Sequence, residues 1–427
     1  MSADIPEQLP SYKTVTEVFD WGPSVSKVII KWKETIESEM VDKNTFKVYA
    51  RRILPDGALC PSLAFKKKEK ISLGSTSKAN NDLQGYREIT DAYVSDENGN
   101  KKSNSQYITI EMSVHPKNNL CAALNFDLNS FFNNFVTPRY TIIQVNPIKN
   151  EKNNIIENNQ GNIRPIVDKF NFNHKNIGGL SSFGYASYEP SDDKKHPLII
   201  WLHGMGEGGS DNPSLPIMAN KANMFADESL QKYFDGAYVL APQSPTFWMH
   251  GKKTLGDGTS IYEESLMKLI NLYIKDHPNI DSSRIYLGGD SNGGYMTLVL
   301  IRDYPEFFAA AFPVCESLKN DLITDSDIQK IGKTPTWFVS AKTDTTVPPK
   351  DYAVPTVERL KKIGANVHFS FFDDVHDTSG KYKKEDGKPY EYYGHFSWIY
   401  VYNDECEEVI EGKNVKLMEW LSNQKRK

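Results

Sequence analysis

The hydrophobic and polar positions follow two different patterns along the chain. From about residue 15 to residue 146, short segments rich in β-branched and aromatic residues tend to alternate polar with apolar side chains, the period of a half-buried strand. Between two of them, ENGNKK predicts a hairpin turn, because Asn-Gly tolerates positive φ. The region shows no convincing amphipathic helix, so we expect an all-β antiparallel sandwich over residues 1–146. Its predicted strands are SKVIIKW (26–32), TFKVYARRI (45–53), YREITDAYV (86–94), QYITIEMSV (106–114) and RYTIIQV (139–145).

A polar segment follows this region. Residues 147–163 are rich in asparagine and have few apolar side chains to bury. We therefore expect a linker or a long loop there.

Beyond residue 164 the apolar residues come in continuous runs, which suit parallel strands covered on both faces. A stretch with helical spacing, YEESLMKLINLYIKDHP (262–278), lies between two of these runs. The alternation predicts an α/β domain over residues 164–427 with a doubly wound, mostly parallel sheet. Its predicted strands are HPLIIWLHG (196–204), GAYVLAP (236–242), RIYLGGD (284–290), AAAFPVC (309–315), PTWFVSA (335–341) and NVHFSFF (366–372).

Length and charge narrow the class of protein. A chain of 427 residues suits two or three domains, at roughly 150 residues per domain. The net charge of −5 implies no extended basic face, so we expect no nucleic-acid partner. No apolar stretch approaches the roughly 20 residues of a membrane-spanning helix. The first residues lack the basic head and apolar core of a secretory signal, so a cytoplasmic location is expected as written; secretion stays open if a signal was removed.

Cysteine and histidine spacing argues against a metal site. The four cysteines are far apart in the sequence and form no CxxC, so we expect four independent thiols, with disulfides as the alternative in an exported protein. There is no H-E-x-x-H motif and no His/Cys pair at ligand spacing. We expect neither a metal nor a cofactor.

The most informative stretch is RIYLGGDSNGGYMT (284–297). Ser291 lies in a G-x-S-x-G pentapeptide between a buried strand and a helix, which is the arrangement of a nucleophile elbow. Such a turn strains the backbone and exposes the serine hydroxyl, and only glycine at the two flanking positions avoids collision with neighbouring chain. The backbone N–H of Asn292 is then placed to donate to a developing oxyanion.

The glycine-rich loop HGMGEGG (203–209) has two interpretations. It satisfies the dinucleotide-binding pattern G-x-G-x-x-G, but the next strand ends in Pro-Gln where a ribose-binding acidic residue should stand. The second interpretation is the loop that supplies a second oxyanion donor. We favour the N–H of Met205 over that of Gly206, although the sequence does not separate them, and we expect His203 to brace the loop.

Three histidines follow Ser291. In proteins with a nucleophile elbow the catalytic residues occur along the chain in the order Ser, then Asp or Glu, then His, so we expect the base among these three. His395 lies in YGHFSWIY, after a glycine and before a helix-like stretch, and is our choice for the base. His376, in a polar loop, is the alternative. His368 lies within a predicted strand, where a packing role is expected.

The acid is expected at the end of a strand. Asp344 directly follows PTWFVSA, where a carboxylate can orient an imidazole and stabilise its positive charge. Asp373 and Asp374 are the competing candidates.

Several motifs in this order resemble one known group of enzymes. HPLIIWLHGMGEGG, APQSPTFWM, DGTSIYEE, RIYLGGDSNGGYMT, AKTDTTVPP and GHFSWIYVYND resemble α/β-hydrolase esterases of the prolyl-oligopeptidase-like, polyhydroxyalkanoate-depolymerase-like group. DWGPSVSKVIIKWKETI and TFKVYARR resemble the N-terminal immunoglobulin-like domain of some of these esterases. The resemblance implies carboxylic-ester hydrolysis with Ser291 as nucleophile, Asp344 as acid and His395 as base.

The leading hypothesis is therefore a serine carboxylesterase that hydrolyses short-chain or aryl esters, including feruloyl and acetyl esters, through an acyl-enzyme. A serine peptidase acting on short peptides is the alternative, because the triad serves esters and amides alike. An adhesive immunoglobulin-like protein with a degenerate hydrolase domain is disfavoured by the intact triad. Gly206, Trp248 and Trp398 are candidate pocket residues, with packing as the alternative for the tryptophans. The expected partner is a small-molecule ester, and a homo-oligomer formed through the N-terminal domain stays open.

Overall fold

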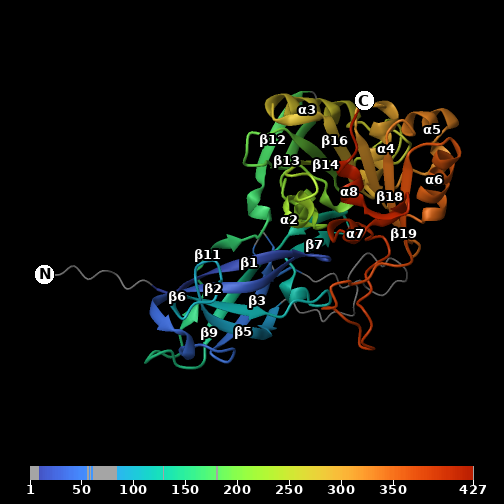
Figure 1. Ribbon diagram of the computed structural model, residues 1–427. Coiled ribbons are helices and arrows are strands. Elements are labelled where there is room, and N and C mark those ends of the chain that lie inside the picture. The colour runs from blue at the N-terminus through green and yellow to red at the C-terminus, as the bar shows by residue number, and fades with distance from the viewer. Residues whose placement is uncertain are drawn as a thin grey trace. The chain divides into compact units, whose positions relative to one another are not determined.

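The computed structural model describes residues 9–54, 57, 59, 60, 84–127, 129–178 and 181–426. The chain forms two compact units (Figure 1). One unit contains Met1–Phe126 and Asn134–Asp168, and the other contains Asp127–Asn133 and Lys169–Lys427. A short segment of the N-terminal half of the sequence therefore belongs to the second unit.

The first unit is an all-β sandwich. Its two main sheets have the strand orders β11-β1-β2-β6-β5 and β10-β9-β3-β4, and their buried side chains, such as Val28 and Ile108 in one and Val48 and Ile142 in the other, form one core. The immunoglobulin-like expectation is confirmed. The elements are β1 (Ser11–Phe19), β2 (Gly22–Glu37), η1 (Ser38–Met40), β3 (Phe46–Ile53), β4 (Gln84–Arg87), β5 (Ile89–Ser95), β6 (Asn104–Met112), η2 (Asn119–Cys121), β9 (Thr137–Gln144), β10 (Ile155–Ile156), β11 (Asn159–Ile163) and η3 (Val167–Lys169).

The turn predicted at ENGNKK joins β5 to β6. Asp96 Oδ1 accepts the N–H groups of Asn98 and Asn100, and Gly99 has φ +88°. The polar turn residues therefore satisfy the backbone where the strand reverses, as the sequence predicts.

One predicted strand is two strands in two sheets. YREITDAYV (86–94) breaks at Glu88, so that β4 pairs with β3 while β5 pairs with β6 of the other sheet. Arg87 is buried at the break, where its guanidinium donates to the carbonyls of Val25 and Ser113. Alternation along a strand cannot reveal such a crossing, because both halves keep the same period.

The Asn-rich segment 147–163, expected as a linker, contributes two strands instead. β10 pairs with β9, and β11 pairs in parallel with β1. Ile156 is buried in the core of the first unit, whereas the side chains of β11 are mostly exposed. A strand at the edge of a sheet is held by backbone hydrogen bonds and needs few apolar side chains. The polar composition of the segment therefore did not indicate a strand.

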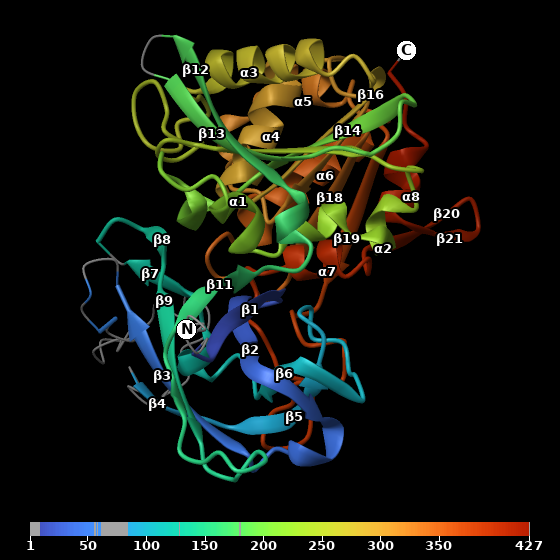
Figure 2. The ribbon, with the colours of Figure 1, turned by 90° about the vertical axis from the view of Figure 1, so that its left-hand side faces the viewer.

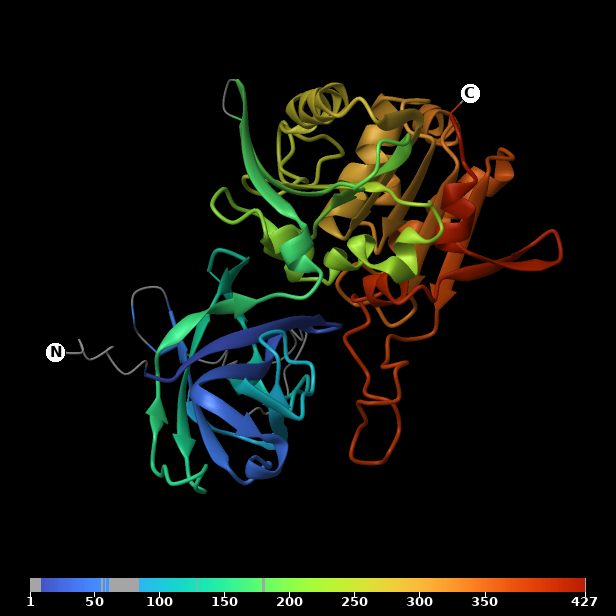
Figure 3. The same cartoon turned by 60° about the vertical axis from the view of Figure 1, so that its left-hand side comes forward.

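The second unit is built on an eight-stranded sheet of order β12-β13-β15-β14-β16-β17-β18-β19. The last six strands in this order are parallel, and β13 pairs antiparallel with both of its neighbours, β12 and β15. The predicted α/β-hydrolase fold is thus confirmed. Strands β20 (Glu407–Ile410) and β21 (Lys413–Lys416) form a separate hairpin, which projects from the second unit in Figure 3. The strands of the main sheet are β12 (Asn171–Gly178), β13 (Ser181–Tyr188), β14 (His196–Leu202), β15 (Tyr238–Gln243), β16 (Ile280–Asp290), β17 (Ala310–Val314), β18 (Thr336–Ala341) and β19 (Val367–Phe372).

Helices cover both faces of this sheet (Figure 2). On one face α3, α4, α5 and α6 pack in a row, and Leu198, Ile200 and Leu202 of β14 belong to the same core. Trp201, pointing to the other face, contacts Phe225 of η5 and Tyr402 of α7. Burial on both faces explains the continuous apolar run of β14. The helices are η4 (Met205–Glu207), α1 (Leu215–Met218), η5 (Ala222–Ala226), α2 (Glu228–Gln231), α3 (Glu263–Asp276), α4 (Asn292–Asp303), η6 (Asn320–Leu322), α5 (Asp325–Ile331), η7 (Pro349–Asp351), α6 (Ala353–Lys362), α7 (Trp398–Tyr402) and α8 (Leu417–Ser422).

Candidate active site

Ser291 stands on the turn between β16 and α4. Its backbone has φ 53° and ψ −111°, a region that non-glycine residues rarely adopt. Its N–H donates to the carbonyl of Val314, 2.9 Å away, which holds the turn against β17. The strained turn leaves the side chain of Ser291 partly exposed at the carboxyl end of the parallel strands.

The flanking glycines are required by close chain approach. A Cβ on Gly293 would stand 1.8 Å from the carbonyl oxygen of Leu202, and one on Gly289 would stand 2.6 Å from that oxygen. Both positions therefore exclude any side chain, which is the physical content of the G-x-S-x-G pattern.

His395 connects Ser291 to Asp344. Its Nε2 lies 2.8 Å from Ser291 Oγ, and its Nδ1 lies 2.7 Å from Asp344 Oδ2. Because ionised Asp344 can only accept, the imidazole donates from Nδ1 and accepts the serine hydroxyl at Nε2. Asp344 Oδ1 accepts the N–H groups of Thr346 and Val347, both at 2.9 Å, so the carboxylate is held in one orientation.

The glycine before His395 is needed for packing. A Cβ on Gly394 would stand 2.4 Å from the carbonyl group of Thr343, one residue before Asp344. The loops that carry His395 and Asp344 can therefore approach closely. His395 and Asp344 are only 4% and 3% exposed, so their pair is shielded from water.

The competing candidates lie elsewhere in the second unit. His376 pairs with Asp374 in the long irregular segment 373–394, and Asp373 pairs with Lys342. His368 pairs with Glu408 and packs against Trp337 and Trp420, which fits the packing role expected for it.

The glycine-rich loop ends β14 and forms η4. Met205 and Gly206 are partly exposed, whereas Gly204 and Glu207 are buried. His203 accepts the N–H of Ser244 at Nε2 over 2.9 Å and donates from Nδ1 to the carbonyl of Gly204 over 2.6 Å. Burial lowers the pKa of His203 to about 4, so the ring is neutral and braces the loop as expected.

Asn292 is the first residue of α4, where backbone N–H groups have no partner within the helix. Its side-chain Oδ1 accepts the N–H of Met249 over 2.9 Å. Asn292 therefore offers its N–H beside Ser291 while its side chain fixes the loop that contains residues 246–250.

Two buried carboxyl groups near these loops were not singled out as functional by the sequence. Glu207 ends η4, and Asp290 directly precedes Ser291. Burial raises the pKa of Glu207 to about 7, and burial with the nearby Glu207 raises the pKa of Asp290 well above its ordinary value. The side chain of Asn220 donates to both. The sequence offers one signal for the pair, which is that a carboxylic acid, Asp290, directly precedes the serine.

The two candidate pocket tryptophans are buried. Trp248 is 0% exposed and lies in the core against Phe183 and Tyr262, so its surface is used for packing rather than for a substrate. Trp398 is 5% exposed and stands edge-on to the ring of His395, with 5.6 Å between centroids. It therefore packs against the imidazole of His395.

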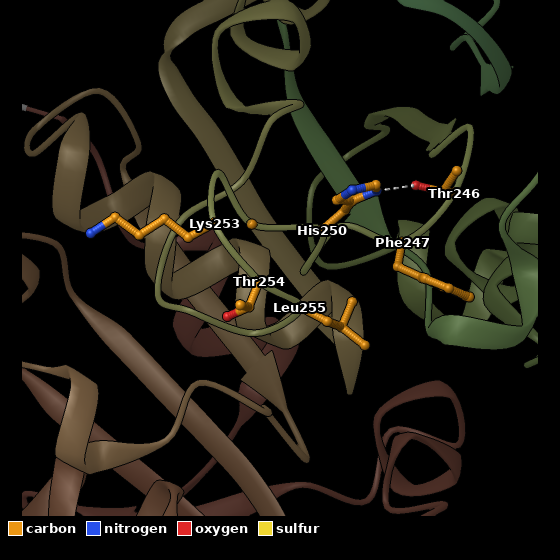
Figure 4. Close-up of a pocket in the computed structure, with 7 residues that line it drawn as sticks. Thr246, Phe247, His250, Lys253, Thr254 and Leu255 are labelled. Atoms are coloured by element: carbon orange, nitrogen blue, oxygen red, sulfur yellow. Dashed lines mark hydrogen bonds between the residues drawn. The ribbon is translucent and has the colours of Figure 1, made fainter.

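A surface pocket of about 430 Å³ lies along the loop fixed by Asn292. Phe247 and Leu255 give it apolar walls, and Thr246 and His250, which share a hydrogen bond, add polar groups (Figure 4). No triad residue lines it.

Residues 127–133 bring a further element into the second unit. They join β7 (Leu124–Asp127) to β8 (Phe132–Phe135). Asn133 Nδ2 donates to Glu207 Oε1 over 2.8 Å, and the rings of Phe132 and Phe247 are 5.2 Å apart. No pattern in the sequence pointed to this contact, since an Asn in a strand carries no functional signal.

The fold and this arrangement of serine, histidine and aspartate define a serine hydrolase. Residues 11–157 match the family described as esterase Ig-like N-terminal domain, and residues 247–330, which include Ser291, match the prolyl oligopeptidase family. The resemblance seen in the sequence is confirmed by both matches. A region similar to prolyl oligopeptidases thus follows a region similar to the immunoglobulin-like domain of esterases.

Two solved structures resemble this chain to different degrees. A structure described as a thermostable esterase is 25% identical, covers 97% of this chain and 100% of its own, and superposes with a TM-score of 0.74. The acylaminoacyl peptidase of Pyrococcus horikoshii is 15% identical over 48% of this chain and 37% of its own, with a TM-score of 0.38. Among curated proteins, no sequence matches this chain.

Two negative observations apply to the described residues. No helix there is long and apolar enough to cross a bilayer. Within the same residues, no cluster of three or more His, Cys, Asp or Glu side chains could hold a metal ion.

Proposed function

We propose that the protein is a carboxylesterase that hydrolyses short-chain or aryl esters, including acetyl and feruloyl esters, through an acyl-enzyme. The observation that carries the proposal is the continuous hydrogen-bonded line from Ser291 Oγ through His395 to Asp344. This line is the machinery of nucleophilic acyl transfer.

The reaction follows from these contacts. Ser291 Oγ attacks the ester carbonyl carbon while His395 Nε2 takes the hydroxyl proton. Asp344 holds the imidazole in the required tautomer and stabilises its positive charge. The N–H groups of Asn292 and Met205 donate to the carbonyl oxygen as it becomes negative. His395 then returns the proton to the departing alcohol, and a water molecule, activated by the same imidazole, releases the acid.

The preference for small or aromatic acyl groups has two supports. Residues 315–335, which join β17 to β18, contain only η6 and α5, and α5 packs against α4 and α6. This connection therefore leaves no large cap for a long chain. The pocket along residues 246–255 includes the apolar side chains of Phe247 and Leu255, against which an aromatic acyl group can pack.

The serine peptidase is the second candidate, favoured by the match of residues 247–330 to the prolyl oligopeptidase family. The match to the esterase domain and the superposition on an esterase weigh on the other side.

A panel of substrates separates the two. We expect turnover of p-nitrophenyl esters of two to six carbons and of a feruloyl ester, with weak or no turnover of aminoacyl-naphthylamides. Ser291→Ala should lower ester turnover by at least ~10³-fold while the circular dichroism spectrum stays native. Turnover of the amides above that of the esters would support the peptidase, and wild-type activity in Ser291→Ala would refute both.

A further inference from the structure

Two carboxyl groups lie buried together between the oxyanion loop and the turn that carries Ser291. Glu207 and Asp290 are 2% and 0% exposed. The Nδ2 atom of Asn220 is 3.2 Å from Glu207 Oε2 and 3.0 Å from Asp290 Oδ2. One amide group thus bridges both carboxyls.

No cation neutralises this pair within the described part of the chain. The side chains of Asn220 and Asn133 donate to Glu207, and both are uncharged amides. Two neighbouring carboxylates that are both buried repel each other and lose their hydration, so one bound proton is strongly favoured.

The other titratable groups near the pair are uncharged. Tyr402 of α7 and Cys315, directly after β17, face it, and burial raises the pKa of each well above its ordinary value. His203, which donates to Gly204, is neutral because burial lowers its pKa. The net charge at this place is therefore set by the protons that Glu207 and Asp290 themselves bind.

The pair contacts the loop at Gly204, the residue before Met205. A Cβ on Gly204 would stand 2.7 Å from Asp290 Oδ2 and 3.1 Å from Glu207 Oε2. Its peptide N–H lowers the pKa of both carboxyls, against the effect of their burial. The position of Met205 and its N–H consequently depends on how this pair is held.

Asn133 completes the arrangement from the segment 127–133. It donates to Glu207 Oε1, the oxygen that Asn220 leaves open. The ring of Phe132, next to Asn133 in the chain, contacts the ring of Phe247 at a tilt of 41° and helps to hold Asn133 in place. Both side-chain oxygens of Glu207 thus accept hydrogen bonds from neutral amide groups.

We propose that Glu207 and Asp290 share one proton and, together with Asn133, act as positioning residues that hold the oxyanion loop against the turn of Ser291. The inference rests on the acyl-enzyme mechanism proposed above. When the shared proton leaves, two adjacent buried negative charges repel, and the loop that carries Met205 moves. Oxyanion stabilisation acts on the transition state, so kcat falls while KM changes little.

The first test replaces one titrating group while keeping its shape. In Asp290→Asn, the amide NH2 can occupy the position of Oδ1, which no described residue hydrogen-bonds, while the oxygen still accepts from Asn220. We expect kcat of the wild type on p-nitrophenyl acetate to fall between pH 7 and pH 10, reversibly, and this fall to be absent in Asp290→Asn. The same alkaline fall in both proteins would overturn the proposal.

The second test uses Asn133. Removing a whole oxyanion donor lowers kcat roughly 10²–10³-fold, so loosening its loop should cost about tenfold. Asn133→Ala should show this loss in kcat with KM within about twofold. Asn134→Ala is the matched control, since Asn134 is the next residue of β8 and is exposed. Equal kcat values in the two variants would contradict the positioning role.

The outcomes separate this inference from the proposed function. Ester turnover that survives in Ser291→Ala overturns the mechanism itself. Turnover that depends on Ser291, but with an unchanged pH profile in Asp290→Asn and unchanged kcat in Asn133→Ala, overturns only the positioning pair. If Asp290→Asn fails to fold, as judged by its melting temperature, Asn133→Ala still decides.

Discussion

Ser291 is accessible because of its backbone rather than its side chain. Ser291 has a backbone φ of 53°, and its N–H group is hydrogen-bonded to the carbonyl of Val314. The flanking glycines lack side chains, so the carbonyl of Leu202 can lie directly against the turn. Strain of this kind persists only where the surrounding chain enforces it. The catalytic geometry is therefore a property of three strands and a helix as much as of one residue.

Asp344→Asn should lower kcat about 10⁴-fold, as the equivalent change does in another serine hydrolase. Asp344 Oδ1 accepts from two peptide N–H groups, so an asparagine keeps its oxygen there and turns its NH2 toward His395. The imidazole must then carry its proton on Nε2, facing Ser291, and cannot accept the hydroxyl proton. Steady-state kinetics test this, with the exposed Asp373→Asn as control, for which we expect wild-type kcat.

Glu207 predicts a specific pH dependence of stability. Its pKa is raised to about 7 in the folded protein, so between about pH 4.5 and pH 7 the native state holds a proton that the unfolded chain releases. The unfolding free energy should therefore fall with rising pH in this window. Urea denaturation should show the difference between wild type and Glu207→Gln decreasing by up to about 3 kcal/mol from pH 4.5 to pH 7.

Glu264→Gln is the matched control, because Glu264 is exposed on α3. A difference between wild type and Glu207→Gln that is constant with pH would contradict the burial of an ionisable Glu207.

At the scale of elements, the β16–α4 turn and the end of β14 must approach closely. We expect Gly293→Ala to lower the melting temperature by several degrees and to reduce ester turnover at least tenfold, because its Cβ would stand 1.8 Å from the Leu202 oxygen. Such overpacking costs roughly 1–3 kcal/mol or more. In Gly85→Ala, by contrast, the nearest atom would be a terminal methyl of Leu120 at 3.2 Å, so this control should stay near wild type.

The loop that contains residues 246–255 should select the larger end of the ester. Leu255 is 57% exposed at the pocket, and Leu255→Trp would fill it. We expect kcat/KM for a feruloyl ester to fall at least tenfold with little change for p-nitrophenyl acetate. Ile363→Trp, an exposed position after α6, serves as control. A parallel loss on both esters would mean that the pocket is not selective.

At the scale of the whole molecule, each unit has its own core. All four cysteines are buried, with Cys60 and Cys121 in the first unit and Cys315 and Cys406 in the second. Units of this kind need not unfold together. Labelling with a thiol reagent in increasing urea should therefore titrate the thiols in two pairs at separate midpoints, and none in the native protein. Simultaneous release of all four would show that the units unfold as one.

Much of the candidate site could be predicted from the sequence, because its residues lie where local rules apply. The elbow around Ser291 is a strand, a turn and a helix in sequence, and Asp344 follows its strand directly. The choice of His395 needed only chain order and a preceding glycine. Met205 and Gly206 are the two candidates for the second oxyanion donor. Both are partly exposed, so the choice of Met205 stays a prediction.

The sequence by itself determined the two kinds of domain and the order of nucleophile, acid and base, since periodicity and turn chemistry act within a few residues. Tertiary structure decided where β4 and β5 separate, that the Asn-rich segment enters both sheets, and that Asn133 reaches Glu207. It also placed Asp290 beside Glu207, 83 residues apart in the numbering, through their common contact with Asn220. Such contacts depend on the packing of distant segments, which no local pattern records.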